Sequence, residues 1–360
     1  MGFHRLFLRY GQMYNMHGDC MKILLYFENQ NMIKISGMGR AFEHQKLALA
    51  SQHIAYTTDP WDTDYDILHI NTYMANSDAI IRSARENGKC VIYHAHSTEE
   101  DFKNSFLFSN QIAPYYKTWL VNRYSQADAI ITPTPYSRSL LIKYGITLPI
   151  YAVSNGIVLE RYAYDYEKVK AFRKYFSLAD DAKTVIGVGL LFQRKGLLDF
   201  IEVAKMLPQY QFIWFGDINK LIIPREITEA MENAPENVIF PGYVKGAIIE
   251  GAYASANCFF FPSYEETEGI VVLEALAARC PMLVRDIGAY DPWLQNGKNC
   301  WMGHNNAEFA DLIAKIVEHQ VPDLTDAGYE TAKERSIDRI GVQLKQVYTK
   351  VLQAAGKPVH

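Results

Sequence analysis

The sequence predicts an α/β protein with two Rossmann-like, doubly wound domains that face a central cleft. Its 360 residues exceed what one hydrophobic core usually holds. From Met21 onward, short aliphatic runs alternate with longer amphipathic stretches, the pattern of βαβ units around a parallel sheet. The series restarts after Asn155, so the expected domains are residues 21–155 and 156–335. The last segment, 336–360, is expected to hold a helix that could pack back on the first domain.

The first domain shows five strand-like runs and two helical patterns. The expected strands are residues 22–27, 65–71, 90–96, 128–134 and 149–155. The expected helices are residues 40–51 and 78–88, the second ending at Gly88, where a helix stop is typical. Residues 1–20 precede the first strand and are interpreted as an N-terminal extension outside the fold.

The second domain repeats this architecture without repeating the sequence. Its expected strands are residues 184–190, 210–216, 237–242, 258–263 and 281–286, and its expected helices are residues 197–207, 247–256 and 271–279. The polar, aromatic segment 159–178 is interpreted as the link between the halves, and residues 337–353 as the final helix. Ligands of open α/β sheets bind at the carboxyl ends of strands, which places the expected site in the cleft.

Composition excludes several classes of protein. A net charge of -4, with 49% apolar and 21% charged residues, is typical of an ordinary folded chain and not of a nucleic-acid-binding one. The five cysteines show no C-x-x-C spacing, which favours reduced thiols in a cytoplasmic compartment over disulfides or a zinc site. No apolar run reaches the roughly 18 to 20 residues of a membrane span, so any membrane contact is expected to be peripheral.

The most informative segment is residues 262–281, a turn and a helix after an apolar strand. Glu266 falls in the turn and Glu274 just inside the helix, where ionised carboxylates can accept hydrogen bonds from sugar hydroxyls. The helix start at Gly269 and Ile270 offers free N–H groups to a diphosphate. Two glutamates at this spacing are by themselves equally typical of a solvated helix start.

This segment resembles the signature of the family 4 retaining glycosyltransferases, an E-x7-E pair within PSxxEGFGxxxLEAxAxGxP. The matching residues are Pro262, Ser263, Glu266, Gly269, Leu273, Glu274, Ala275, Ala277 and Pro281. Thr267, Glu268 and the Arg279-Cys280 pair depart from it. The resemblance covers nearly the whole chain from Met21 and implies a GT-B fold. It also implies that Glu266 contacts the transferred hexose and Glu274 the ribose hydroxyls.

A second candidate element is the loop Arg194-Lys195-Gly196 between a strand and a helix. Two cations before a helix start suit a pyrophosphate leaving group, although a surface Arg-Lys pair would look the same. The family pattern is GRLxxxKG, which implies that Lys195 is the phosphate lysine. The arginine of that pattern is Leu190 here, and Arg194 could substitute for it.

His94 and His96 lie at the carboxyl end of an expected strand, with both rings on one side. A metal site is one interpretation, but no third ligand of suitable spacing is apparent. One ring in the core and one capping a loop is another. Resemblance to diacylglycerol glucosyltransferases, which carry a similar histidine before a Glu-Asp pair, implies that His96 acts beside the hexose, with Glu100 and Asp101 as that pair.

Two further elements have weaker signals. Gly37 and Gly39 lie between the first strand and first helix, where backbone N–H groups could approach donor phosphate, or where the chain could simply turn. Asp62, Asp64 and Asp66 could be read as a DxD-type metal site. They precede a strand, however, and should therefore lie at the amino end of the sheet, away from the site.

Residues 102–124 combine aromatic and basic side chains. Lys103, Phe106, Lys117, Trp119 and Arg123 are the candidate acceptor and membrane residues. A basic, aromatic surface can lie on an anionic bilayer and receive a lipid acceptor, whereas the other interpretation is a helix whose aromatic rings pack in the core.

The resemblance implies a bacterial glycolipid synthase. The expected reaction moves a hexose, Gal or Glc, with retention from a UDP-sugar to glucosyl-diacylglycerol, forming a diglycosyl-diacylglycerol of the lipoteichoic acid anchor type. Alternatives are a 1,2-diacylglycerol 3-glucosyltransferase and a transferase with a non-lipid saccharide acceptor. The expected partners are a nucleotide sugar, a lipid acceptor and the anionic inner face of the cell membrane, without a metal cofactor.

Two other classes of protein fit less well. A sugar-nucleotide-binding protein without turnover would need Lys195 and Glu274 but not Glu266 or His96. A two-domain dehydrogenase would need G-x-G-x-x-G after a strand, and Phe192 stands where the third glycine is required.

Overall fold

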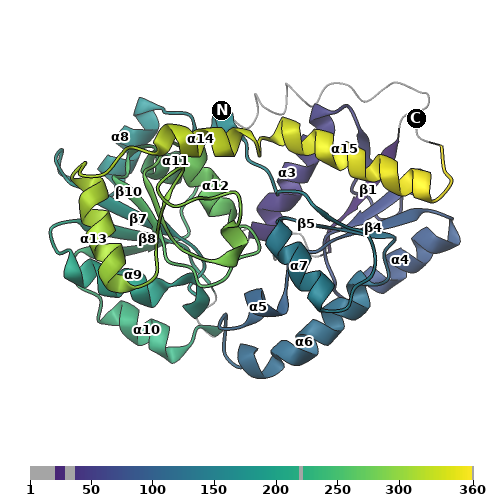
Figure 1. Cartoon of the computed structure of the whole chain (residues 1–360), viewed down its shortest axis with the longest axis horizontal. Coiled ribbons are helices and arrows are strands. Elements are labelled where there is room, and N and C mark those ends of the chain that lie inside the picture. Colours follow the sequence, from purple (N-terminus) through teal and green to yellow (C-terminus); the bar gives the residue numbers. More distant parts are fainter. Residues whose placement is uncertain (1–20, 29–36, 219–221, 359–360) are drawn as a thin grey trace. The chain divides into compact units, whose positions relative to one another are not determined.

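The computed structural model describes residues 21–28, 37–218 and 222–358 (Figure 1). The expected extension, residues 1–20, lies outside them. The described residues form two compact units. The first contains the residues up to Glu99, Pro114–Ile157 and those from Arg335 onward, and the second contains Glu100–Ala113 and Val158–Glu334. Residues 100–113 therefore belong to the second unit, although the sequence places them inside the first half.

The first unit contains a six-stranded parallel sheet in the order β2-β1-β3-β4-β5-β6. Its strands are β1 (Lys22–Tyr26), β2 (Ala55–Thr57), β3 (Ile67–Ile70), β4 (Cys90–His94), β5 (Ala129–Thr132) and β6 (Ile150–Ala152). Its helices are α3 (Gly37–Ser51), α4 (Ser77–Glu86), α7 (Pro135–Lys143) and α15 (Ile337–Ala354), and α5 (Glu99–Phe102) and α6 (Ser109–Tyr124) continue into the second unit. The strand order reverses between β1 and β3, where ligands of doubly wound sheets bind.

The final helix, α15, packs on α3, and Figure 1 shows the two side by side. A Cβ on Gly341 would lie 2.4 Å from the backbone oxygen of Ala48, so the helices meet closely because this residue has no side chain. Ile340, Leu344 and Tyr348 of α15 are buried. The segment expected to pack back on the first half thus groups with the first unit.

The second unit contains another six-stranded parallel sheet, in the order β12-β11-β10-β7-β8-β9. Its strands are β7 (Thr184–Val188), β8 (Gln211–Phe215), β9 (Val238–Gly242), β10 (Cys258–Phe261), β11 (Met282–Arg285) and β12 (Trp301–Gly303). Its helices are α8 (Tyr166–Tyr175), α9 (Leu197–Met206), α10 (Arg225–Glu232), α11 (Ala247–Ser255), α12 (Ile270–Ala277), α13 (Asn306–Val317) and α14 (Thr325–Lys333). Counted from β7 the order is 3-2-1-4-5-6, which reverses between β7 and β10.

Two parallel, doubly wound sheets confirm the expected fold class. All ten expected strands are present, whereas the short edge strands β2 and β12 were not expected. Segment 159–178 is not a mere link, because it contains α8 and belongs to the second unit. A Cβ on Gly251 would lie 2.0 Å from the Lys168 carbonyl oxygen, so α11 packs directly against α8.

Among the described residues, no helix is long and apolar enough to cross a membrane. The four cysteines in this part of the chain, Cys90, Cys258, Cys280 and Cys300, are buried and unpaired with one another.

Candidate active site

The donor-side residues of the second unit gather where its strand order reverses. Lys195 ends a short 3-10 turn (Gln193–Lys195) after β7, and Glu266 follows β10. Gly196 joins the turn to α9 with φ at 77°, and a Cβ there would lie 2.3 Å from the Pro262 carbonyl oxygen. The glycine therefore lets the Lys195 turn approach the end of β10.

Lys195 and Glu266 form a buried ion pair. The Lys195 ammonium donates to Glu266 Oε1 at 2.5 Å, and Ser263 Oγ donates to the same oxygen at 2.7 Å. Burial alone would raise the pKa of Glu266, but the charges of Lys195 and Arg194 outweigh it and lower that pKa. Burial and Arg194 lower the pKa of Lys195, against the opposing effect of Glu266 and Asp101. The site therefore holds a cation beside an ionised carboxylate.

Arg194 faces the protein's own segment 100–113. Its guanidinium contacts Asp101 Oδ1 at 2.9 Å, Ser105 Oγ at 2.8 Å and the Glu265 carbonyl oxygen at 3.0 Å. Its backbone N–H donates to the Asn104 carbonyl oxygen. Arg194 thus holds this segment on the second unit, a role that the interpretation as a phosphate arginine did not include.

The remaining donor-side candidates lie at the start of α12. Gly269 precedes the helix with φ at 85°, and a Cβ on it would lie 3.7 Å from Glu266 Cγ, so Ile270 begins the helix next to Glu266. Glu274 is buried in the helix, and its Oε2 accepts a hydrogen bond from the Tyr253 hydroxyl at 2.8 Å. Tyr253 was not expected, because nothing in α11 distinguishes it from a core aromatic residue.

In the first unit, His96 lies in a stack of three imidazoles. The His94 and His96 rings are stacked with centroids 4.1 Å apart, and His69 stacks on His94 at 5.3 Å. Gln45, Asn71 and Tyr348 bond to the stack. The sequence did not single out His69 or these three partners, which come from α3, the end of β3 and α15.

The stack is buried and neutral. His69, His94 and His96 are at most 8% exposed. Burial lowers the pKa of His96 to about 3 and, together with the neighbouring His96, that of His69 to about 3. The described residues contain no group of three His, Cys, Asp or Glu side chains that could hold a metal ion. Both rings are in the interior, and His96 bonds to Asn71 in the loop after β3.

The neutral stack makes stability depend on pH. His69 and His96 take up protons below about pH 6.5 when the chain unfolds, but only near pH 3 in the folded state, and burial lowers the pKa of His94 as well. The free energy of unfolding should therefore be highest above pH 6.5 and fall by up to about 1.4 kcal/mol per pH unit per histidine as the pH drops towards 3. Urea unfolding at pH 7.5, 6.0 and 5.0 measures this slope.

His69→Gln should make the slope shallower, and His53→Gln, at an exposed position of the same unit, should not change it. Equal slopes in the wild type and His69→Gln would contradict the conclusion that the buried, neutral histidines cause the pH dependence of stability.

The weaker candidates are placed as follows. Gly37 is exposed at the start of α3 with open space at its Cα, and Gly39 is buried. Asp62 and Asp64 pair with the Lys22 ammonium at 3.0 and 3.4 Å, and Asp66 Oδ2 accepts from the Lys22 backbone N–H. These acids therefore lie at the amino end of β1, where the Lys22 ammonium pairs with Asp62 and Asp64.

Of the residues expected at the surface of the aromatic segment, Trp119 is exposed, together with apolar residues outside the expected set. Phe106 packs on Phe102 with ring centroids 5.0 Å apart. Lys117 pairs with Glu99 at 3.4 Å, and Arg123 pairs with Asp78. The exposed apolar residues are Leu107, Phe108, Ile112, Tyr115 and Trp119. Ile112, Tyr115 and Trp119 recur at helical spacing and form one outward stripe on α6.

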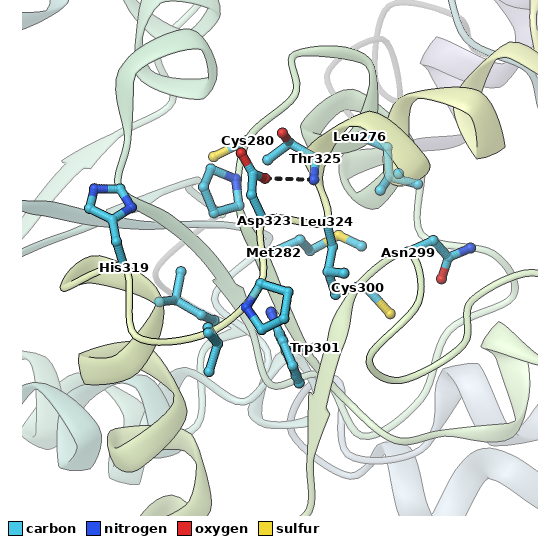
Figure 2. A pocket seen from close by; sticks show the side chains of 15 residues that line it. Leu276, Cys280, Met282, Asn299, Cys300, Trp301, His319, Asp323, Leu324 and Thr325 are labelled. Atoms are coloured by element: carbon cyan, nitrogen blue, oxygen red, sulfur yellow. Dashed lines mark hydrogen bonds between the residues drawn. The ribbon is translucent and has the colours of Figure 1, made fainter.

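A cavity of about 70 Å³ lies elsewhere in the second unit (Figure 2). It is lined by Met282 and Trp301, the first residues of β11 and β12, and by Asp323, whose carboxylate accepts a hydrogen bond from the Thr325 backbone N–H. It is therefore at the amino edge of the sheet, opposite to the edge of Lys195 and Glu266.

Known proteins match both halves of the chain. The family model "Glycosyltransferase Family 4" matches residues 41–161, and "Glycosyl transferases group 1" matches residues 169–335. The processive diacylglycerol alpha-glucosyltransferase of Acholeplasma laidlawii is 49% identical over 334 residues, 92% of this chain and 99% of that protein. The chain belongs to this glycosyltransferase family. The expected family and the hexosyltransferase activity are thereby confirmed.

A more distant relative and two solved structures also match this glycosyltransferase. The alpha-galactosylglucosyldiacylglycerol synthase of Streptococcus pneumoniae is 25% identical, covering 85% of this chain and 84% of that protein. The structure of Anabaena HepE in complex with UDP-glucose matches with a TM-score of 0.71 at 18% identity, over 92% of this chain and all of HepE. Sucrose-phosphate synthase from Thermosynechococcus elongatus matches with a TM-score of 0.72 at 17% identity, over 93% of this chain and all of that one. The fold is GT-B.

Proposed function

We propose that this glycosyltransferase moves glucose from UDP-glucose to glucosyl-diacylglycerol, with retention, and forms a diglucosyl-diacylglycerol. The observation that carries the proposal is the buried Lys195–Glu266 pair beside the start of α12, which offers a cation for a diphosphate and a carboxylate for sugar hydroxyls. Glucose is favoured over galactose by the name of the relative that is 49% identical, whereas the 25% identical relative is named for galactose.

The pair suggests how the donor is held. When a diphosphate enters, Lys195 can turn from Glu266 to the phosphate oxygens, and Glu266 becomes available to accept hydrogen bonds from the hexose. The bond from the anomeric carbon to the phosphate oxygen then breaks while the acceptor oxygen bonds to the same face, and the acceptor proton passes to the leaving phosphate. Lys195 and the N–H groups at Ile270 stabilise the leaving charge, so no metal is required.

Retention is supported by the "alpha-glucosyl" in the relative's name, because glucose is α-linked in UDP-glucose as well. Glu274 would hold the ribose hydroxyls, and His96 would contact a substrate hydroxyl from the first unit.

A lipid acceptor requires access to a bilayer. The exposed stripe Ile112, Tyr115 and Trp119, with Phe108 before it, is apolar and aromatic, and such residues insert at the headgroup boundary. Lys103, Lys117 and Arg123 are the basic residues of this segment, but Lys117 and Arg123 already pair with Glu99 and Asp78, so the apolar stripe carries the proposed membrane contact. We therefore place the enzyme peripherally on the inner face of the cell membrane, with this stripe in contact with lipid.

Truncating this apolar surface should weaken membrane binding without affecting donor binding. The triple variant Phe108→Ser, Ile112→Ser and Tyr115→Ser, which removes Phe108 and two of the three stripe residues, is expected to reduce co-sedimentation with phosphatidylglycerol vesicles about 100-fold or more, because three membrane-inserted apolar side chains each contribute about 1–3 kcal/mol. UDP affinity should be unchanged. Val342→Ser, at an exposed apolar position of α15, is the matched control. Unchanged sedimentation of the triple variant would show that the stripe does not bind the membrane.

Transfer assays test the reaction. Purified enzyme in mixed vesicles receives radiolabelled UDP-glucose or UDP-galactose, with EDTA present, and either diacylglycerol or glucosyl-diacylglycerol. Labelled diglucosyl lipid with an α-linkage supports the proposal. Transfer only to non-lipid saccharides would contradict it.

A second candidate function is glucosylation of diacylglycerol itself. The relative's name favours it, because that name gives diacylglycerol as the lipid that is glucosylated. Accumulation of monoglucosyl lipid from diacylglycerol, without further transfer, would favour this candidate.

A further inference from the structure

A closed pair of side-chain amides supports the histidine stack. Gln45 Nε2 donates to Asn71 Oδ1 at 2.7 Å, and Asn71 Nδ2 donates back to Gln45 Oε1 at 2.9 Å. Both side chains are buried, at 4% and 0% exposure. In this arrangement the pair presents Asn71 Oδ1 to His96 and Gln45 Nε2 to His94.

The amides determine where each imidazole carries its proton. Asn71 Oδ1 can only accept, so His96 Nε2, at 2.8 Å, must donate. Gln45 Nε2 can only donate, so His94 Nδ1, at 2.9 Å, must accept. Both rings are therefore neutral and protonated on Nε2.

The third ring follows the same pattern. His69 Nε2 is 3.2 Å from His94 Nδ1, which already acts as an acceptor, so His69 Nε2 donates. Its Nδ1 is then left to accept from the Tyr348 hydroxyl at 2.7 Å. All three histidines share one tautomer.

This pattern leaves the Nδ1 lone pair of His96 as an unused acceptor. Within the described part of the chain, no hydrogen bond reaches that atom, and none reaches the buried Nε2 of His94. An unpaired buried donor costs about 1–3 kcal/mol, so keeping one beside an unpaired acceptor fits a site that a polar group completes. A neutral nitrogen acceptor recognises a hydroxyl and offers nothing to a phosphate oxygen.

We propose that Gln45 and Asn71 are positioning residues that hold His96 neutral, with its Nδ1 ready to accept a hydrogen bond from a substrate hydroxyl. Only the identity of the hydroxyl, from the donor hexose or from the acceptor glycolipid, rests on the proposed function. Within the first unit, the titratable groups stacked on or bonded to His96 directly or through this network are His94, His69 and Tyr348, and all are neutral.

The tautomers can be measured directly by ¹⁵N NMR. In the wild-type protein labelled with ¹⁵N-histidine, His69, His94 and His96, assigned by single substitution, are expected to show a protonated Nε2 and an unprotonated Nδ1 at pH 7. A proton on Nδ1 of His96, or an imidazolium at that pH, overturns the inference whatever the enzyme transfers. Correct tautomers without hexose transfer to any lipid would instead contradict the proposed function alone.

Asn71→Asp tests the consequence for the reaction. The carboxylate still accepts from His96 Nε2 but favours the imidazolium, which has no Nδ1 lone pair. The variant should lose kcat/KM about tenfold for each pH unit below its new pKa and recover at high pH, while Asn87→Asp, exposed at the end of α4, keeps the wild-type profile. A rise in the KM for UDP-glucose assigns the hydroxyl to the hexose, and a rise in the KM for the lipid assigns it to the acceptor. An unchanged pH profile in Asn71→Asp overturns the proposal.

Discussion

Replacing Glu266 with glutamine is expected to lower kcat/KM for hexose transfer by about 100- to 1,000-fold, the usual effect of removing one preorganised electrostatic contact. Glutamine keeps an oxygen that can accept from Ser263 and Lys195, so the fold should persist. What it loses is the negative charge that pairs with Lys195 and the strong acceptor for sugar hydroxyls. Radiolabelled transfer from UDP-glucose measures the effect, with circular dichroism as the check on folding.

The matched control for this substitution is Glu202→Gln. Glu202 also pairs with a lysine, Lys205, in the second unit, but both side chains are about half exposed. Exposed pairs contribute at most about 1 kcal/mol, so the control should retain wild-type kcat/KM. If the two variants were equally active, Glu266 would have no role in the reaction.

Gly196→Ala should disrupt the donor side more severely than its single added methyl suggests. The residue has φ at 77°, where alanine costs about 1–2 kcal/mol, and its Cβ would overlap the Pro262 carbonyl oxygen at 2.3 Å. Because neither backbone can yield without moving Lys195 away from Glu266, we expect a loss of about 2–4 kcal/mol in unfolding free energy. Activity should fall at least tenfold as the pair separates.

Gly297→Ala separates the cost of the positive φ from the cost of the overlap with the Pro262 carbonyl oxygen. Gly297 has φ at 71°, and its nearest neighbour to an added Cβ is Trp301 at 3.9 Å, an ordinary contact. It should show only the backbone cost of about 1–2 kcal/mol and full activity, measured by urea unfolding and by transfer. Equal behaviour of the two alanine variants would mean that the close approach to Pro262 does not position Lys195.

Local sequence pattern accounts for much of the fold and the donor side. Buried parallel strands are short aliphatic runs, and Lys195, Glu266 and Glu274 were predicted because they come after such runs near a helix start and match the motifs of the family that the chain resembles. The pattern failed for the edge strands β2 and β12, whose sequences Ala-Tyr-Thr and Trp-Met-Gly contain no aliphatic run. It also failed for α8, where Asp165 caps the helix by accepting from Glu167 and Lys168, a start signal that the aromatic composition obscured.

The sequence by itself determined the order of elements, the family and the residues that end the strands, because these depend on neighbours in the chain. Only the tertiary structure decided which side chains bond to the site residues. Tyr348 reaches His69 across 279 residues, and Ser105 meets Arg194 across 89. No local period encodes such contacts, since they arise when helices pack on a sheet and bring distant side chains together. For the same reason the proton positions in the histidine stack follow from the packed amides of Gln45 and Asn71, not from the H-x-H motif.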